Sequence, residues 1–297
     1  DLHLLSRRQR QMCIRDSIGN EGVVFTNSFV ANSISGPSRA CMLTGKHSHK
    51  NGFIDNAHRF DGSQQTFPKL LQKAGYQTAI VGKWHLTSNP TGFDYWNILI
   101  GQGDYYNPYF IDNGKKVQIE GYATNITTDL ALEWLENKRE KEKPFCLLLP
   151  HKAPHRTWMP DTCDLGAFDK VKFPLPENFH DDYEGRIAAA SQEMGIAEDM
   201  DLIYDLKMLK DGQESRLKKT YECMLNRMDS LERKQFEDFY APITEEFYKL
   251  NLKGKELAEL KASLDTIRTT AAEIINIIQP PEREAPETIH HLSLIHI

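Results

Sequence analysis

The segment from Ser35 to Gly45, SGPSRACMLTG, constrains this chain more than any other stretch. Pro37 suits the first turn of a helix, where a missing N–H costs nothing, and Gly45 suits the left-handed position that ends a helix. A helix of roughly two turns is therefore predicted. Its free N–H groups favour a bound anion, and the forked guanidinium of Arg39 matches sulfate or phosphate oxygens. Ser35 would lie at the mouth of this anion site.

The same segment resembles the signature of type I sulfatases, Cys/Ser-x-Pro-Ser-Arg-x-x-x-x-Thr-Gly, and it fills every fixed position of that signature. The resemblance implies that Ser35 becomes the nucleophile after oxidation to formylglycine, whose hydrated aldehyde attacks sulfur. It also implies a partner, the radical maturating enzyme that oxidises the serine form and is found mainly in bacteria. For a lone Ser-x-Pro-Ser-Arg string, an ordinary capped helix is the alternative.

Hydrophobic periodicity and turn residues predict strands that alternate with helices along the chain. The predicted strands are Val23–Phe25, Gln77–Val81, Phe145–Leu149 and a hairpin around Asp112–Gly114, and the predicted helices are Phe67–Ala74 and Thr127–Glu142. This alternation predicts an α/β fold with a mostly parallel central sheet flanked by helices. The sulfatase resemblance implies that this sheet is an incomplete part of an alkaline-phosphatase-like sandwich.

Basic side chains follow two of the predicted strands directly. Lys83 and His85 come after the first strand, and His151, Lys152 and His155 come after the second. Because ligands bind beyond the carboxyl ends of parallel strands, we expect both clusters to converge at one edge of the sheet. The resemblance implies that Lys83 and His85 touch the sulfate and the formylglycine. It places His155 near the leaving-group oxygen, as an acid or a sulfate contact.

Several of these residues have a plainer alternative. The Gly82–His85 segment, taken alone, is also typical of a turn with a surface lysine and a half-buried histidine. His151 and Lys152 are candidates for substrate binding, but solvated loop positions explain them equally well. Trp158 could stack on a sugar face or simply pack under its loop.

The resemblance also implies a calcium ion. In the family this ion is held by carboxylates before the signature and late in the chain, and by the formylglycine, so Ser35 is the one metal-binding position expected here. Calcium needs about six to eight oxygen ligands, which Ser35 alone cannot supply. We therefore expect calcium in the complete enzyme, and we expect the present fragment to lack the other ligands and to be inactive.

The bulk properties exclude some classes of protein. A net charge of −6 and a pI near 6.0, without a sustained basic stripe, argue against nucleic-acid binding. Five cysteines without paired short spacings predict neither a zinc site nor a dense disulfide framework. The sequence contains no run of about eighteen apolar residues, so no membrane-spanning helix is predicted.

The two ends of the chain look foreign. Residues 1–17 and the last residues resemble translated adapter sequence, so we interpret the chain as a gene fragment. Residues 18–260 are expected to form the N-terminal part of the sulfatase catalytic domain, which is charged and helical after about residue 181, with helix-compatible stretches at 200–209 and 216–240. Residues 261–297 are expected to hold a further helix, a linker and a non-native end.

These features predict a sulfuric ester hydrolase that acts on a sulfated amino sugar in glycosaminoglycans or mucin-type glycans, most similar to bacterial N-acetylglucosamine-6-sulfatase-like enzymes. Two alternatives stay open. One is a phosphodiesterase or phosphonate hydrolase of the same superfamily, and the other is a non-catalytic protein that binds sulfated glycans. Because polymeric glycans do not enter the cytoplasm intact, we expect a periplasmic or cell-surface location.

Overall fold

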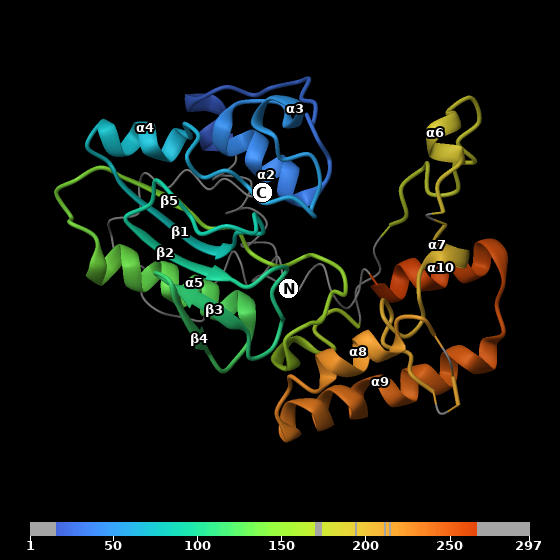
Figure 1. The fold of residues 1–297 in the computed structure, drawn as a ribbon. Helices are drawn as coiled ribbons and strands as arrows, with labels where there is room; N and C mark the ends of the chain where they lie inside the picture. The colour runs from blue at the N-terminus through green and yellow to red at the C-terminus, as the bar shows by residue number, and fades with distance from the viewer. Residues whose placement is uncertain (1–15, 170–173, 194, 211, 214, 266–297) are drawn as a thin grey trace.

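The computed structural model describes residues 16–265, except 170–173, 194, 211 and 214. The chain forms an α/β body followed by a mainly helical part (Figure 1). In the α/β body, α2, α3 and α4 lie on one side of a sheet and α5 lies on the other. In the helical part, α8 and α9 pack together, and α6 projects away from them.

The sheet has five strands in the order β4-β3-β2-β1-β5. The strands are β1 (Gln77–Lys83), β2 (Tyr95–Leu99), β3 (Tyr109–Asp112), β4 (Lys115–Gln118) and β5 (Phe145–Leu148). Strand β1 pairs in parallel with both β2 and β5, whereas β3 pairs antiparallel with β2 and with β4. The predicted α/β class is confirmed, with a parallel centre and an antiparallel hairpin at one edge.

Alternate residues of β1 face opposite layers. Ile80 packs in one cluster with Ala40 and Leu43 of α2 (Ser35–Thr44). Ala79 and Val81 pack on the other face, against α5 (Ala123–Glu133) and the π-helical turn Trp134–Lys138 that continues it. This period of two is expected for a strand that is buried on both sides. Burying a side chain such as Leu43 contributes about 2 kcal/mol.

The remaining helices are short, except in the last third of the described chain. They are α3 (Ser48–Asn51), α4 (Phe67–Lys73), α6 (Ile187–Ala190), α7 (Ile196–Asp199), α8 (Lys218–Leu225), α9 (Ser230–Leu250) and α10 (Gly254–Asp265), with a 3₁₀ turn at Thr162–Asp164. A separate core joins α8 and α9 to the rest of the chain, because Leu225 and Phe236 pack with Tyr106, Met159 and Ile203.

Several local predictions are confirmed. Helix α4 follows Thr66 and has Pro68 in its first turn. The hairpin between β3 and β4 turns at Asn113 (φ 44°) and Gly114 (φ 95°), where two positive φ values match the twist of the strands. The two buried strands after residues 76 and 144 are β1 and β5.

Other predictions are wrong. Residues 23–25 are not a strand: Phe25 is 78% exposed, and none of the described strands pairs with this run, so its backbone gains no ladder hydrogen bonds. Residues 200–209 form turns instead of a helix, because the Asp201 carboxylate accepts the N–H groups of Ile203 and Tyr204. The predicted helix 127–142 begins four residues earlier, at Ala123, and its π-helical end is at Lys138.

The predicted helical stretch 216–240 contains two helices. Asp229 caps α9 by accepting the N–H groups of Leu231 and Glu232, and Glu232 accepts the Asp229 N–H in return, which separates α9 from α8. The helix predicted from Leu257 is α10 as far as Asp265, and its continuation lies outside the described residues.

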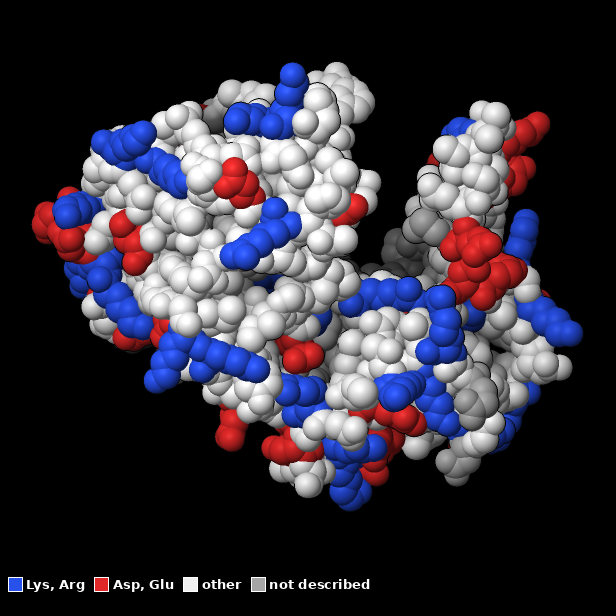
Figure 2. Space-filling view, in the orientation of Figure 1, with Lys and Arg blue, Asp and Glu red and all other residues white. Residues whose placement is uncertain are grey.

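In the face drawn in Figure 2, cationic and anionic side chains are interspersed. Within the residues that the structure describes, no helix combines the length and the apolar character that crossing a bilayer requires.

Candidate active site

Ser35 is the first residue of α2, and the sequence around it explains why the helix begins there. Ile34 is extended, and its N–H donates to the Asn32 side chain over 2.9 Å. The Gly36 N–H donates to Asn56 Oδ1 over 3.0 Å, and a Cβ on Gly36 would lie only 2.7 Å from the Phe53 ring. Glycine therefore permits the close approach of α2 to the loop that carries Asn56.

The far end of α2 has the predicted cap. Gly45 adopts a left-handed conformation with φ 66°, and its N–H donates to the carbonyl of Cys41. The helix has 10 residues, which is longer than predicted.

The end of β1 lies against the segment that follows β5. Gly82 has φ 117°, and a Cβ at this position would lie 2.2 Å from the Pro150 carbonyl oxygen. The next N–H, that of Lys83, donates to the same oxygen over 2.6 Å. The two basic clusters that follow these strands therefore start at one edge of the sheet, as expected for parallel neighbours.

Side chains from α2 and from the end of β1 meet at this edge. Ser35 Oγ lies 3.1 Å from Nδ1 of His85. Arg39 Nη1 donates to the Lys83 carbonyl oxygen over 2.7 Å. The first half of α2 thus brings a hydroxyl and a guanidinium to the end of β1, where the charges of Arg39 and Lys83 repel each other.

The electrostatics of this cluster favour a bound anion. Burial, together with the neighbouring charges of Arg39 and Lys152, lowers the pKa of Lys83 to about 7. Burial also lowers the pKa of Arg39 to about 10. For His85, burial and the same cations lower the pKa to about 4. A sulfate or phosphate group would relieve this repulsion between cations.

Lys152 belongs to the same cluster. It is 5% exposed, its Nζ donates to the Gln102 carbonyl oxygen over 3.3 Å, and it lies 4.6 Å from the centre of the Tyr105 ring. Its charge also contributes to the lowered pKa values of His85 and His155. Burial of both His151 and Lys152 excludes the alternative of solvated loop positions.

His155 and Trp158 follow in the same loop. Burial lowers the pKa of His155, and the charges of Lys83 and Lys152 add to that effect. The His155 carbonyl accepts a hydrogen bond from the Tyr105 hydroxyl over 2.6 Å. Trp158 is partly buried, and Lys207 Nζ lies 5.9 Å from its ring centre. This partial exposure is compatible with both the packing and the sugar-stacking alternatives.

Two contacts of the site have no counterpart in the sequence prediction. The Asn56 amide orients the start of α2, and the Tyr105 hydroxyl holds the His155 backbone. Both act across loops that are distant in sequence, so no local spacing indicates them.

Calcium does not fit the described residues alone. Among them, no group of three or more His, Cys, Asp or Glu side chains is placed to hold a metal ion. Ser35 Oγ contacts the His85 imidazole beside the cations Arg39 and Lys83, whereas calcium requires several oxygen ligands.

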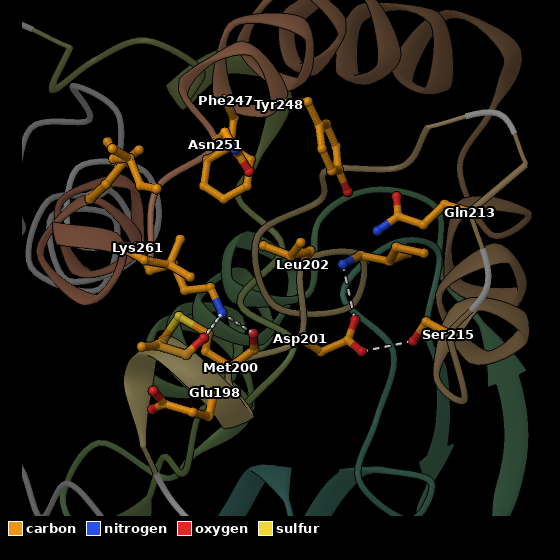
Figure 3. Close-up of a pocket in the computed structure, with 15 residues that line it drawn as sticks. Glu198, Met200, Asp201, Leu202, Gln213, Ser215, Phe247, Tyr248, Asn251 and Lys261 are labelled. Atoms are coloured by element: carbon orange, nitrogen blue, oxygen red, sulfur yellow. Dashed lines mark hydrogen bonds between the residues drawn. The ribbon is translucent and has the colours of Figure 1, made fainter. Parts of the chain in front are cut away.

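A separate pocket of about 450 Å³ lies in the helical part (Figure 3). Asp201, Ser215, Tyr248 and Lys261 are among the residues that line it. Its lining includes none of the clustered residues around Ser35, so we do not assign the active site to it.

Comparison with known proteins identifies the class. Residues 6–240 match the sulfatase family model, so the chain belongs to the sulfatase family. The fold is accordingly the alkaline-phosphatase-like α/β fold, present in part.

Individual relatives are amino-sugar sulfatases. The chain is 52% identical over 253 residues to an N-acetylglucosamine-6-O-sulfatase of Bacteroides thetaiotaomicron, covering 83% of this chain and 45% of that protein. It is 31% identical over 188 residues to the human N-acetylglucosamine-6-sulfatase, covering 55% of this chain and 34% of the human protein.

A solved structure is also similar, with a TM-score of 0.79 and 49% identity, over 89% of this chain and 54% of the other. That protein is in complex with its substrate, D-glucosamine-2-N,6-O-disulfate. The chain thus spans about half the length of the bacterial relative and of the solved structure, and about a third of the human protein.

Proposed function

We propose that the protein containing this chain is a sulfuric ester hydrolase that removes a sulfate, most simply the 6-O-sulfate, from glucosamine in a sulfated glycan. The observation that carries the proposal is the cluster at α2, where Ser35 Oγ lies 3.1 Å from His85 beside Arg39 and Lys83. The named substrates of the relatives support the choice of an amino sugar.

We propose that Ser35 acts as formylglycine, produced by a radical maturating enzyme. An unmodified serine hydroxyl has a pKa far above neutrality and needs an activating group to attack a charged ester. Formylglycine would supply a hydrated aldehyde, with one hydroxyl to attack sulfur and a second to release sulfate. The Ser35 position at a helix N-terminus suits a group that handles an anion.

The other residues of the cluster have distinct roles in this proposal. Arg39 and Lys83 neutralise the sulfate oxygens as negative charge shifts during cleavage. His85 is neutral at pH 7 because its pKa is lowered to about 4, and its Nδ1 forms a hydrogen bond with the hydroxyl at position 35. His155 donates a proton to the departing alcohol, because the negative charge of the bound sulfate offsets the cations that, in addition to burial, lower the pKa of His155.

The residues that follow β5 would bind substrate. Lys152 adds a third cation beside Lys83, and His151 and Trp158 complete the loop around it. We assign these three residues to the sugar and sulfate contacts.

The complete protein is further proposed to use calcium and to work in the periplasm or at the cell surface. Carboxylates outside the described residues would have to hold the ion, because the basic cluster does not. The location follows from the substrate, since a polymeric sulfated glycan does not enter the cytoplasm intact.

The proposal is tested with the complete gene product after co-expression with a maturating enzyme. Release of sulfate from glucosamine-6-sulfate should exceed hydrolysis of an aryl phosphodiester. A higher rate on the phosphodiester would identify a phosphodiesterase or phosphonate hydrolase instead. Tight binding of the sulfated sugar without turnover would identify a binding protein.

A further inference from the structure

The residue after His155 is held by a buried carboxylate from a distant segment. Arg156 Nε and Nη2 donate to the two carboxylate oxygens of Asp205 over 2.5 and 2.6 Å. Asp205 is only 2% exposed and lies 49 positions further along the chain. This bidentate geometry is the most directional form of ion pair between arginine and a carboxylate.

A second contact joins the same two segments beside the first. Lys207, 3% exposed, donates from Nζ to the Thr157 carbonyl oxygen and, over 2.5 Å, to the Asp205 carbonyl oxygen. Arg156 and Thr157 are therefore both attached to the stretch 205–207, one through its side chain and the other through its backbone.

The stretch that supplies these groups is itself fixed. The Asp201 carboxylate accepts two backbone N–H groups and, over 2.7 Å, the hydroxyl of Ser215, the contact drawn in Figure 3. Asp205 also accepts the Asp201 N–H over 2.8 Å. Ile203 and Met208 are fully buried. The turns at 201–208 are thus held by hydrogen bonds and by burial, and they contact the loop that carries His155 through Asp205 and Lys207.

Stability alone does not explain a charged pair at this place. Only the carboxylate of this pair is buried, and apolar residues of similar volume often stabilise such a position as well as an ion pair does. What a bidentate pair adds is direction, and here it fixes the residue next to His155. The Tyr105 hydroxyl donates a hydrogen bond to the carbonyl of His155 itself, which is a second contact that holds this part of the loop.

We propose that Arg156 and Asp205, supported by Lys207, are positioning residues that aim His155 at the leaving-group oxygen. This inference rests on the proposed role of His155 as the proton donor. A general acid contributes only when it lies within hydrogen-bond distance of the atom it protonates, so a small shift of the loop removes its effect.

The test compares two sulfate esters in the complete, matured protein. When the S–O bond of glucosamine-6-sulfate breaks, the sugar departs as an alkoxide that needs a proton. Cleavage of 4-nitrophenyl sulfate releases a stabilised phenolate that does not need one. Asp205→Asn should lower kcat on the sugar sulfate by on the order of tenfold or more, with little change in KM. The kcat on the aryl sulfate should change by less than about threefold.

Two further variants keep the test decisive. Arg156→Gln removes the same ion pair from its more exposed side, since the Arg156 side chain is 44% exposed. If Asp205→Asn does not fold, the two rates are compared in Arg156→Gln instead. Asp181→Asn removes the exposed ion pair with Arg186, which also has a 2.5 Å contact but lies outside the site, and it should leave both rates unchanged.

His155→Ala separates the inference from the function it rests on. If His155→Ala reduces only the sugar-sulfate rate and neither Asp205→Asn nor Arg156→Gln does, the positioning role is wrong and the acid role stands. If His155→Ala reduces both rates equally, the acid role is wrong and the positioning proposal falls with it. Equal losses on both substrates in Asp205→Asn, or none, would also overturn the positioning role.

Discussion

Ser35 Oγ lies 3.1 Å from Nδ1 of His85, although 50 positions separate the two residues in the chain. The N-terminus of α2 and the end of β1 create this contact, and the absence of a Cβ on Gly36 lets the helix approach, since that atom would lie 3.1 Å from the His85 carbonyl oxygen. Because α2 also packs on the sheet through Ala40 and Leu43, the same core that stabilises the fold fixes the geometry of the site.

The protonation of His85 gives a first prediction. Its folded pKa, lowered to about 4 by burial and nearby cations, lies below the ordinary value of 6.5. Between these values the unfolded chain binds a proton that the folded chain does not, so His85 should make the protein lose stability as the pH falls from 6.5 towards 4.

Imidazole NMR titration measures this pKa directly. The His85→Gln variant should identify its signal and should show less acid destabilisation in urea unfolding. A His85 ring that titrates near pH 6.5 in the folded protein would contradict the proposed electrostatics of the cluster.

The charge of Lys83 gives a second prediction, on sulfate affinity. With a pKa of about 7, Lys83 is charged below that pH and increasingly neutral above it, beside the cations Arg39 and Lys152. Sulfate should bind with constant affinity below pH 7 and lose up to about tenfold per pH unit above it, because binding then requires uptake of a proton.

Calorimetric titration with sulfate between pH 6 and 9 would measure this dependence. Lys83→Arg, which keeps its charge, should move the decrease to higher pH, and Lys83→Met should bind weakly at every pH. A wild-type affinity that stays constant up to pH 9 would contradict the lowered pKa.

Gly82 gives a third prediction, on stability. In Gly82→Ala the new Cβ would meet the Pro150 carbonyl oxygen at 2.2 Å on a backbone with φ 117°. We expect a loss of about 3 kcal/mol or more in the free energy of unfolding, together with displacement of the loop after β5.

Gly75→Ala is the matched control, because Gly75 also has a positive φ (88°) but open space around it. It should cost about 1 kcal/mol from backbone strain alone. Equal losses in the two variants, measured by chemical unfolding, would show that the close approach of the two strand ends is not important.

The sequence predicted the elements whose signals are local. The capped helix at Ser35, the Asn113–Gly114 hairpin and the strand at Gln77 each depend on a few adjacent residues, and the structure confirms them. The convergence of Lys83 and Lys152 also followed from the sequence, because parallel strand ends share one edge of the sheet.

The remaining features depend on partners that local pattern does not contain. Residues 23–25 have the composition of a strand, but a strand also needs a paired neighbour, and none is present among the described residues. The turns at 201–208 arise from the Asp201 carboxylate, which competes with helical hydrogen bonds. The bond between Arg156 and Asp205 joins loops too far apart in sequence for any spacing to indicate it.

The nucleophile is the central claim, and peptide mass spectrometry tests it most directly. The complete protein, co-expressed with an anaerobic radical maturase, should yield a peptide of residues 31–46 that has lost two hydrogens at Ser35, and its activity should rise with the modified fraction. Ser35→Ala should abolish turnover, by several orders of magnitude, while keeping sulfate affinity. A fully active protein whose Ser35 is unmodified, or a Ser35→Ala variant that retains activity, would contradict the proposal.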